Sequence, residues 1–415
     1  MASKTSVVQQ ILRNHGRQAL AALAGCVPGC VWDAALAALD RMLTCGTPEA
    51  GFVRFRCETC GEMKTVPFTC KSRLCPSCGW VYAQRFMERL APRLIRTSYR
   101  HIVCSVPREL RPLFYWNREL LPVACHAAAA AVMRAFETRC RKYRLVPGIV
   151  ATCHTFGSNL RFHVHVHLLV TQGGLQVGGC WQPVHFFPGP QYRKLWQYHL
   201  LTQLRKALSK DHPAQSTLGQ LFRKHPTGFI VNLETEYDSL RRALRYCCRY
   251  LARPPIGDRR VLSYDGHHVT FEYKDYKAHT KRGHQHKARK TPTKRRHRCK
   301  AERFVRLLLQ HVLPRYARNI HYYGLYQPQA RKRWFAQARR ATKFPEDFDS
   351  TPARPLSWRE RIIAAFQADP IQCPNCGNEM VYHDVRWPPR RNSPRGRRSR
   401  QQRLLQLPLP LPRPP

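Results

Sequence analysis

Apolar residues recur at helical spacing along several long stretches of the chain. The stretch from Val7 to Leu43 shows this spacing on both sides of a short break, and the stretch from Glu109 to Arg144 shows it over a greater length. Two further helices are predicted around Gln191 to Lys210 and at RFVRLLLQHVL. The segment from Asp238 to Arg253 has the same periodicity and ends at two prolines, which cannot continue a helix.

Short β-rich runs lie between these helices. HIVCSVP, GIVATCHTF, FHVHVHLLV and GFIVNLE each predict a strand. RRVLSYDGHHVTFEYKD predicts a hairpin, because Asp265-Gly266 supplies turn residues that tolerate positive φ. Strands interspersed with helices favour an α+β fold, in which an N-terminal helical and cysteine-rich module precedes a domain with a central antiparallel sheet and flanking helices.

The net charge indicates a polyanionic partner. The chain has 71 Lys and Arg against 25 Asp and Glu, a formal charge of +46. DNA suits such a surface, because each neutralised phosphate releases counterions. An anionic membrane is the rival, but the sequence has no uninterrupted apolar run of spanning length and no signal-peptide layout. No GxxxxGK[ST] loop occurs either, so neither a membrane partner nor a nucleotide cofactor is expected.

Two segments read as unstructured. Residues Lys277 to Lys300 include eleven Lys or Arg and no acid. The tail from Arg386 is rich in Arg and Pro, which favours extended polyproline conformation. Both are interpreted as non-specific phosphate clamps, with solvated charge of no function as the alternative.

The cysteines indicate metal binding. Eighteen cysteines in a long chain without an export signal are better explained by reduced thiols and metal sites than by disulfides. Two CxxC turns that together supply four thiolates match a tetrahedral zinc site, with a fifth cysteine able to replace one of the four; the predicted ligands are Cys57, Cys60, Cys75 and Cys78, and the alternative is Cys70. Unliganded or redox-active cysteines are the competing reading.

A further CxxC near the C-terminus, Cys373 and Cys376, is only half of a zinc site. His383 is a conceivable partner, and no convincing fourth ligand is evident in the sequence. A plain turn is the alternative.

Three histidines share one face of a predicted strand. In RFHVHVHLLV, His163, His165 and His167 alternate with Val164 and Val166, which point to the other face. Clustered imidazoles repel one another when protonated, whereas a divalent ion binds the neutral rings. The strand therefore predicts a metal site, with a solvated face as the alternative.

The helical segment SLRRALRYCCRYLARPP places two tyrosines four residues apart on the border between an apolar stripe and a basic face. Tyr246 and Tyr250 are candidate nucleophiles. A metal ion that polarises a phosphodiester would let a tyrosine hydroxyl attack it, giving a 5′-phosphotyrosine and a free 3′-hydroxyl. The predicted DNA-binding residues are Arg242, Arg245 and Arg249 on this segment, and Lys294, Arg295 and Arg296 in the basic insert.

Together these motifs resemble the HUH endonucleases, in which a His-hydrophobe-His strand precedes a tyrosine helix. The closer resemblance is to rolling-circle bacterial transposases with paired tyrosines, the type named for insertion sequence ninety-one. Elements in the expected order include CETCG…CKSRLCPSC, FHVHVHLLVTQGG, YCCRYLARPPI, FVRLLLQHVLPRYARNIHYYGLY and CPNCGNEM. Leu74 stands where the family often has histidine, which favours zinc ligation by cysteines alone.

Residue by residue, the resemblance makes Tyr246 and Tyr250 the paired nucleophiles and His165 and His167 the HUH pair. His163 becomes a possible third ligand or an alternative register. The family also implies Mg²⁺ or Mn²⁺ as the catalytic ion and structural zinc in the N-terminal module.

The implied activity is a transposase that nicks single-stranded DNA at an element end and rejoins it at a target, in the bacterial cytoplasm and associated with the nucleoid or a plasmid. The expected division of the chain is a helical region (1–44), a zinc-binding module (45–92), an HUH catalytic domain (93–326, with the basic insert 277–300), a C-terminal region with CxxC (327–385) and a disordered tail (386–415). A replication initiator or relaxase with the same chemistry, and a non-catalytic zinc-finger DNA-binding protein, are the alternatives.

Overall fold

The structure is a computed structural model of the chain, and it describes residues 6–139, 144–176, 179–185, 188–237, 242–244, 254–275, 293–342 and 356–388. Its helices are α1 (Val7–Ala21), α2 (Gly29–Leu43), α3 (Pro76–Leu90), α4 (Arg111–Trp116), α5 (Leu121–Arg139), α6 (Gly189–Ala207), α7 (Ala214–Lys224), α9 (Ala301–Leu309), α10 (Pro328–Ala341) and α11 (Trp358–Phe366).

The strands are β1 (Phe52–Arg56), β2 (Met63–Pro67), β3 (Tyr99–Ser105), β4 (Leu145–Val146), β5 (Gly148–Phe156), β6 (Phe162–Thr171), β7 (Gly173–Gln176), β8 (Trp181–Pro183), β9 (Val231–Tyr237), β10 (Val261–Tyr264), β11 (His268–Asp275), β12 (Thr293–Lys300), β13 (Ile320–Gly324) and β14 (Val381–Arg386). The mixture of helices and antiparallel sheets confirms the predicted α+β class.

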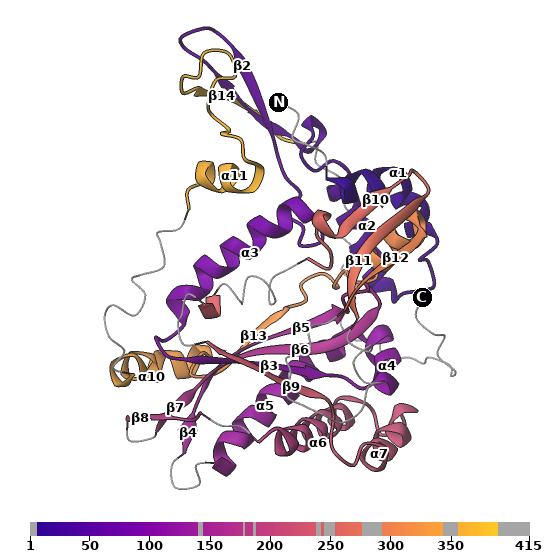
Figure 1. Ribbon diagram of the computed structural model, residues 1–415, viewed down its shortest axis with the longest axis vertical. Helices are drawn as coiled ribbons and strands as arrows, with labels where there is room; N and C mark the ends of the chain where they lie inside the picture. Colours follow the sequence, from indigo (N-terminus) through magenta and orange to yellow (C-terminus); the bar gives the residue numbers. More distant parts are fainter. Residues whose placement is uncertain are drawn as a thin grey trace.

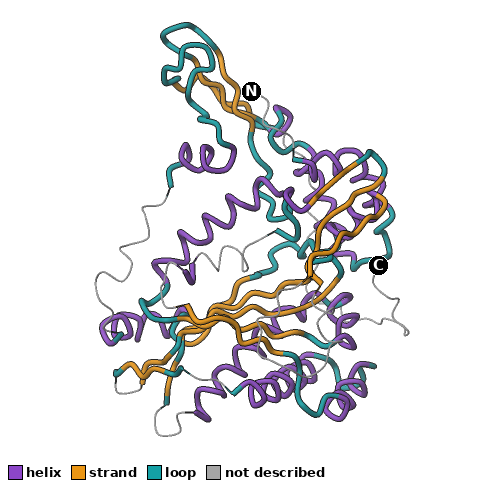
Figure 2. Tube along the Cα trace, viewed as in Figure 1, coloured by secondary structure: helices purple, strands orange, loops and turns teal. Residues whose placement is uncertain are grey.

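A five-stranded antiparallel sheet lies at the centre of the molecule, in the order β13-β5-β6-β3-β9 (Figure 2). The histidine-containing strand β6 is the middle strand, so both of its edges are paired. The sequence of β6 suits this central position, because one face of the strand is apolar along its whole length and can be covered by helices. Figure 1 shows α5, α6 and α7 on one side of this sheet and α3 on the other.

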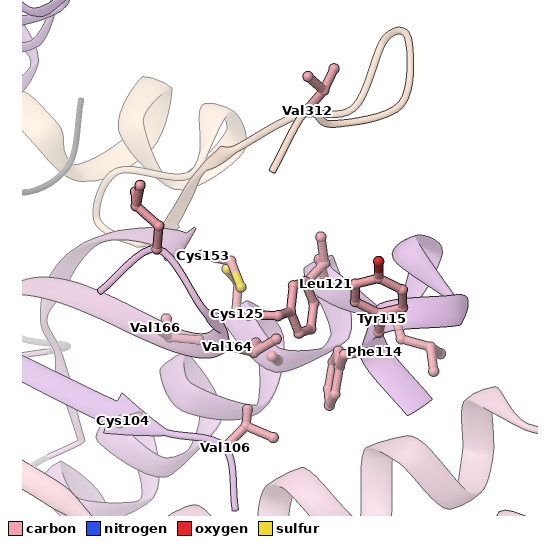
Figure 3. Packing of buried hydrophobic residues seen from close by; sticks show 14 of the residues in the cluster. Cys104, Val106, Phe114, Tyr115, Leu121, Cys125, Cys153, Val164, Val166 and Val312 are labelled. Atoms are coloured by element: carbon pink, nitrogen blue, oxygen red, sulfur yellow. The ribbon is translucent and has the colours of Figure 1, made fainter. Parts of the chain in front are cut away.

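The helix-covered face is built from the valines that separate the histidines. Val164 and Val166 are fully buried together with Cys104 of β3, Cys153 of β5 and Cys125 of α5 (Figure 3). Because side chains alternate along a strand, burying these valines turns the histidines toward the opposite face. The apolar face therefore fixes the orientation of the polar one.

Residues Arg118–Thr138, which include most of α5, are the one described helical segment long and apolar enough to cross a membrane, and 61% of the tested window is buried inside the protein. Its Ala and Cys side chains pack against β5 and β6. Packing in the core explains its apolar character.

The opposite face of the sheet is covered in part by α3. Phe86 and Leu90 of α3 belong to one buried apolar cluster with Val150 of β5, Leu169 of β6 and Leu244. Leu169 follows His167 by two residues and shares its face of the strand. Leu244 is thus packed on the face that presents the histidines.

Helix α1 packs on α9 and on β10 of a second, three-stranded sheet, β10-β11-β12, and α2 packs on α1. The predicted hairpin is confirmed. Gly266 adopts the positive φ of +93°, whereas Asp265 accepts hydrogen bonds from the backbone N–H groups of His267 and His268. The Asp265 carboxylate therefore stabilises the turn by hydrogen bonding. The backbone of Asp265 does not have a positive φ.

The prediction that the whole basic insert is unstructured was wrong for Thr293–Lys300, which forms β12. Its partner strand β11 supplies Glu272 and Asp275, whose carboxylates lie 3.1 Å and 2.9 Å from the cationic groups of Lys294 and Arg295. These ion pairs reduce the repulsion within the basic strand. Residues 276–292 lie outside the described part of the chain.

A third sheet joins two distant parts of the sequence, in the order β14-β1-β2 (Figure 1). Val53 of β1 pairs with Val385 of β14, and Arg54 pairs through its side chain with Asp384. The tail prediction was wrong at its start, because Arg386 ends β14 and Trp387 and Pro388 are placed beyond it. Residues 389–415 lie outside the description.

We expect Leu168→Ala to lower the free energy of unfolding by about 2–5 kcal/mol, the usual cost of a cavity at a buried leucine. Leu168 is fully buried in the centre of the sheet, whereas Leu262 on β10 is 48% exposed. Leu262→Ala is the matched control and should change the stability by less than about 1 kcal/mol. Urea unfolding followed by circular dichroism measures both; equal effects would contradict the placement of β6 in the core.

Candidate functional site

Three histidines from two adjacent strands converge on one point. Single ring nitrogens of His154, His165 and His167 all lie within 4.8 Å of one another. His154 is on β5 directly opposite His165 on β6, and the His154 and His167 rings have centroids 4.6 Å apart. His154 and His167 are buried and His165 is half-buried. Three imidazoles in this arrangement fit a single divalent cation.

His163, expected as a possible third ligand or an alternative register, does not belong to this group. Positions 163 and 167 are four residues apart, about 13 Å along an extended strand, which is too far to share one ion. Its neighbour His165 is closer, with ring centroids 5.0 Å apart. Burial, together with the neighbouring His165 and Arg111, lowers the pKa of His163 to about 3, so its ring is neutral.

His154 was missed by the sequence reasoning, although a signal for it exists. It lies in GIVATCHTF, the strand predicted just before the histidine strand. Pairing the two runs as a hairpin brings position 154 opposite position 165. The register was needed to see this, because a slip of one residue would turn His154 to the other face.

Neighbouring groups orient the rings of the two β6 histidines. Nδ1 of His165 lies 3.0 Å from the carbonyl oxygen of His163, and Nδ1 of His167 lies 3.0 Å from Nε2 of His101. Both Nδ1 atoms are thus engaged, and Nε2 is the nitrogen with which each ring would bind an ion. His101 is a buried residue of β3 in the run HIVCSVP, and it was also missed.

Tyr246, Tyr250, Arg245 and Arg249 lie outside the described residues. Arg242 is described and exposed, and Ala243 and Leu244, which follow it, are buried. Lys294, Arg295 and Arg296 are exposed on β12, in the sheet whose strand β10 packs against α1. Two of these three cations pair with carboxylates of β11, as described above.

The cysteines form two four-membered groups. The first is Cys45, Cys70, Cys75 and Cys78, and the second is Cys57, Cys60, Cys373 and Cys376. Close sulfur–sulfur distances are 3.5 Å for Cys45–Cys78 and 3.4 Å for Cys57–Cys376. A tetrahedral zinc with bonds of about 2.3 Å has sulfurs about 3.8 Å apart, so both groups fit a structural zinc ion.

The predicted grouping of Cys57 and Cys60 with Cys75 and Cys78 was therefore wrong. The first pair lies in the loop between β1 and β2, and the extended strand β2, about 16 Å long, lies between it and the second pair in the sequence. Cys75 and Cys78 instead begin α3. At the base of the same hairpin, the Gly46 N–H donates to the Phe68 carbonyl. This contact brings the two ends of the hairpin together, so Cys45 lies near Cys70. Cys70 thus joins Cys75 and Cys78, and Cys45 is the ligand that the sequence reasoning missed.

The second group explains the C-terminal CxxC, for which the sequence showed no fourth ligand. CETCG and CPNCG form similar turns, because Gly61 and Gly377 have φ of +74° and +77° and each donates its N–H to the first cysteine of its pair. Cys373 and Cys376 meet Cys57 and Cys60 across more than 300 residues. His383 is not a member of the group.

We expect the full-length chain to hold two zinc ions. Cys373→Ser/Cys376→Ser and Cys75→Ser/Cys78→Ser should each remove one ion, because each pair belongs to a different group. Metal analysis of the purified proteins measures this. The control is Cys26→Ser/Cys180→Ser, since both cysteines are exposed and belong to neither group. An unchanged zinc content after Cys373→Ser/Cys376→Ser would contradict the second group.

Two regions of the chain match known protein families. Residues 148–333, which include β5, β6 and the candidate tyrosines, match a family model described as "Putative transposase", and residues 11–106 match a "Transposase zinc-binding domain" of the IS91 (insertion sequence ninety-one) type. The second match contains the whole first cysteine group, but only half of the second.

Two curated relatives are similar over most of their length. The transposase for insertion sequence element IS801 of Pseudomonas savastanoi pv. phaseolicola is 28% identical over 84% of this chain and 83% of its own. The "Putative transposase y4qJ" of Sinorhizobium fredii is 26% identical over 83% of this chain and 89% of its own. No solved structure matches. Both family matches and both relatives are transposases, and the cysteine groups of the N-terminal region fit structural zinc. The chain belongs to the IS91-type transposases with an N-terminal zinc-binding domain.

Proposed function

We propose that this transposase cuts and rejoins single-stranded DNA by tyrosine attack, with His154, His165 and His167 as the ligands of a catalytic Mg²⁺ or Mn²⁺ ion. The observation that supports this most strongly is the convergence of three imidazoles on one face of the central sheet. When bound there, the ion would polarise a phosphodiester oxygen and orient the leaving group.

The position of Leu244 supports a role for the tyrosines at the same face. Leu244 is buried in the cluster that contains Leu169, which shares the histidine face of β6. Two peptide units separate Leu244 from Tyr246, a distance of at most about 7 Å between their Cα atoms. This short tether to a residue packed on the histidine face supports the proposal that Tyr246 acts there.

In the proposed step, the tyrosine oxygen attacks the phosphorus of a DNA phosphodiester. A bond forms between this oxygen and phosphorus, and the bond from phosphorus to the 3′ oxygen breaks. The leaving 3′ oxygen ends as a hydroxyl, and the proton lost by tyrosine balances it. The 5′ end stays bonded to the protein, so the bond energy is conserved for rejoining.

His101 has a positioning role in this account. For Nε2 of His167 to bind a cation, its Nδ1 must hold the proton and donate it to His101. A buried histidine at this place fixes the tautomer of His167. The family match and the transposase names of the relatives favour transposition over replication initiation for this chemistry.

We expect a covalent protein–DNA adduct on labelled single-stranded DNA from the element ends, formed only with Mg²⁺ or Mn²⁺. Tyr246→Phe or Tyr250→Phe should abolish or sharply reduce the adduct, because phenylalanine has no nucleophilic oxygen. Tyr316→Phe is the control, since Tyr316 is 96% exposed on a loop after α9. Gel separation under denaturing conditions measures the adduct; full adduct formation by the Tyr246→Phe/Tyr250→Phe double variant would exclude these nucleophiles.

We expect three histidine substitutions to rank in a fixed order by the Mn²⁺ concentration needed for half-maximal adduct. His101→Gln should raise it about 10–100-fold, as is typical of groups that orient a ligand, and His154→Gln should raise it further because a ligand is lost. His163→Gln is the matched control on the same strand and should have little effect. If His163→Gln were as damaging as His154→Gln, the proposed ligand set would be wrong.

A further inference from the structure

A cavity of about 1010 Å³ lies apart from the histidine site, between the β1–β2 hairpin, α3 and the C-terminal segment. Its walls come from α3, from the end of β2, from α11 and from the residues after β14. It also borders the first cysteine group through Cys70 and Cys78. Neither the proposed tyrosine chemistry nor the zinc sites require such a space.

Two tryptophans of the C-terminal segment line this cavity with their rings partly exposed. Trp387 is 74% exposed and its ring centroid lies 5.1 Å from that of Phe68. Trp358 is 44% exposed and stacks on Phe55, with centroids 6.1 Å apart. Each indole is thus supported by a phenylalanine of the hairpin region while it remains accessible. Exposed aromatic rings rimmed by polar groups are typical of binding sites.

The other notable lining residues are cationic. Arg41, Lys71, Arg85 and Arg89 are exposed, and among the described residues no carboxylate lies within ion-pairing distance of these four side chains. Arg361 also lines the cavity, but it forms a 2.7 Å ion pair with Glu88 that holds α11 against α3. Among the described residues, Glu49 is the one acidic residue that lines the cavity. The cavity therefore attracts anions.

We propose that this cavity binds a single-stranded segment of the DNA that the transposase processes, with bases stacked on Trp387 and Trp358 and phosphates held by Arg85, Arg89 and their neighbours. Accessible indole faces combined with unneutralised cations are the features that recognise unpaired nucleotides. A duplex hides the faces of its bases, so it cannot use the two rings in this way. The identity of the strand as element or target DNA rests on the proposed function.

Helix α3 connects this cavity to the histidine face. Tyr82, Arg85 and Arg89 are spaced three and four residues apart and line the cavity. Phe86 and Leu90, on another side of the helix, pack in the cluster that covers the histidine face of the sheet. A strand bound in the cavity is thus held by the same helix that packs on the candidate catalytic face.

The second cysteine group positions one wall of the cavity. Cys373 and Cys376 bind the C-terminal segment to the β1–β2 loop, and β14 pairs with β1 just before Trp387. Arg359 of α11 also forms ion pairs with Asp369 and Glu379 in this segment. The tryptophans are therefore held on an ordered wall.

The test is fluorescence anisotropy of a labelled oligothymidylate with the full-length, zinc-loaded protein. Trp387→Ala should weaken binding about tenfold or more, the usual effect of losing one base-stacking ring. Trp387→Phe keeps a ring and should retain most of the affinity. Arg85→Gln/Arg89→Gln should reduce the slope of log K against log salt by about 1.4, because each phosphate contact on a single strand contributes about 0.7.

The matched controls are Tyr316→Ala and Arg193→Gln, which remove an exposed aromatic ring and an exposed cation away from the cavity. Zinc content and the urea midpoint, measured on every variant, report folding. Wild-type affinity of folded Trp387→Ala and Arg85→Gln/Arg89→Gln would overturn the proposal, as would equal losses in the controls. The proposal would also be overturned if the variants weakened binding to duplex DNA or to RNA but left binding to oligothymidylate unchanged.

The outcome is separable from the proposed tyrosine chemistry. Oligothymidylate affinity of the Trp387→Ala and Arg85→Gln/Arg89→Gln variants tests the cavity, whereas adduct formation by the Tyr→Phe variants at saturating DNA tests the tyrosines. An adduct without cavity-dependent binding contradicts this proposal alone. Cavity-dependent binding without any adduct in the wild type contradicts the tyrosine mechanism and leaves the binding site standing.

Discussion

The strict two-residue alternation of β6 is the constraint on which the rest of the molecule depends. One face of the strand is apolar enough to be buried under α5 and its neighbours, with Val164, Val166 and Leu168 all inaccessible to solvent. The histidines must then face the other way, toward the side on which α3 and Leu244 pack. Pairing on both edges of β6 fixes the register of the strands. His154 of β5 therefore lies opposite His165, and the ring of His101 of β3 contacts the ring of His167. The core and the candidate site are two faces of one strand.

A second constraint joins the two ends of the sequence. Cys57 and Cys60 lie in one group with Cys373 and Cys376 of the C-terminal segment. Strand β14 of this segment pairs with β1 in the same sheet. The C-terminal segment therefore belongs structurally to the zinc-binding module. This connection also brings Trp358 and Trp387 opposite the cationic side of α3, where they line the cavity. Zinc at both groups would stabilise the cavity wall as well as the fold.

Local patterns predicted the parts that depend on local physics. Helical periodicity found α1, α2, α6 and α9, and alternation found β5, β6 and the β10–β11 hairpin. The pairing of distant residues was beyond these patterns. Which CxxC joins which depends on the length and direction of β2, and the role of His154 depends on register. Composition was misleading for β12, because a run of basic residues is compatible with a strand when its neighbour supplies carboxylates such as Glu272.

The most direct test of the central claim is pulsed electron paramagnetic resonance of Mn²⁺ bound to the full-length protein, which detects imidazole nitrogens coordinated to the ion. We expect nitrogen coupling in the wild type and in His163→Gln. The coupling should be weakened in His154→Gln and lost in His165→Gln/His167→Gln. Coupling that disappears with His163 and is unaffected by His154, or bound Mn²⁺ without nitrogen coupling, would contradict the assignment of the metal site.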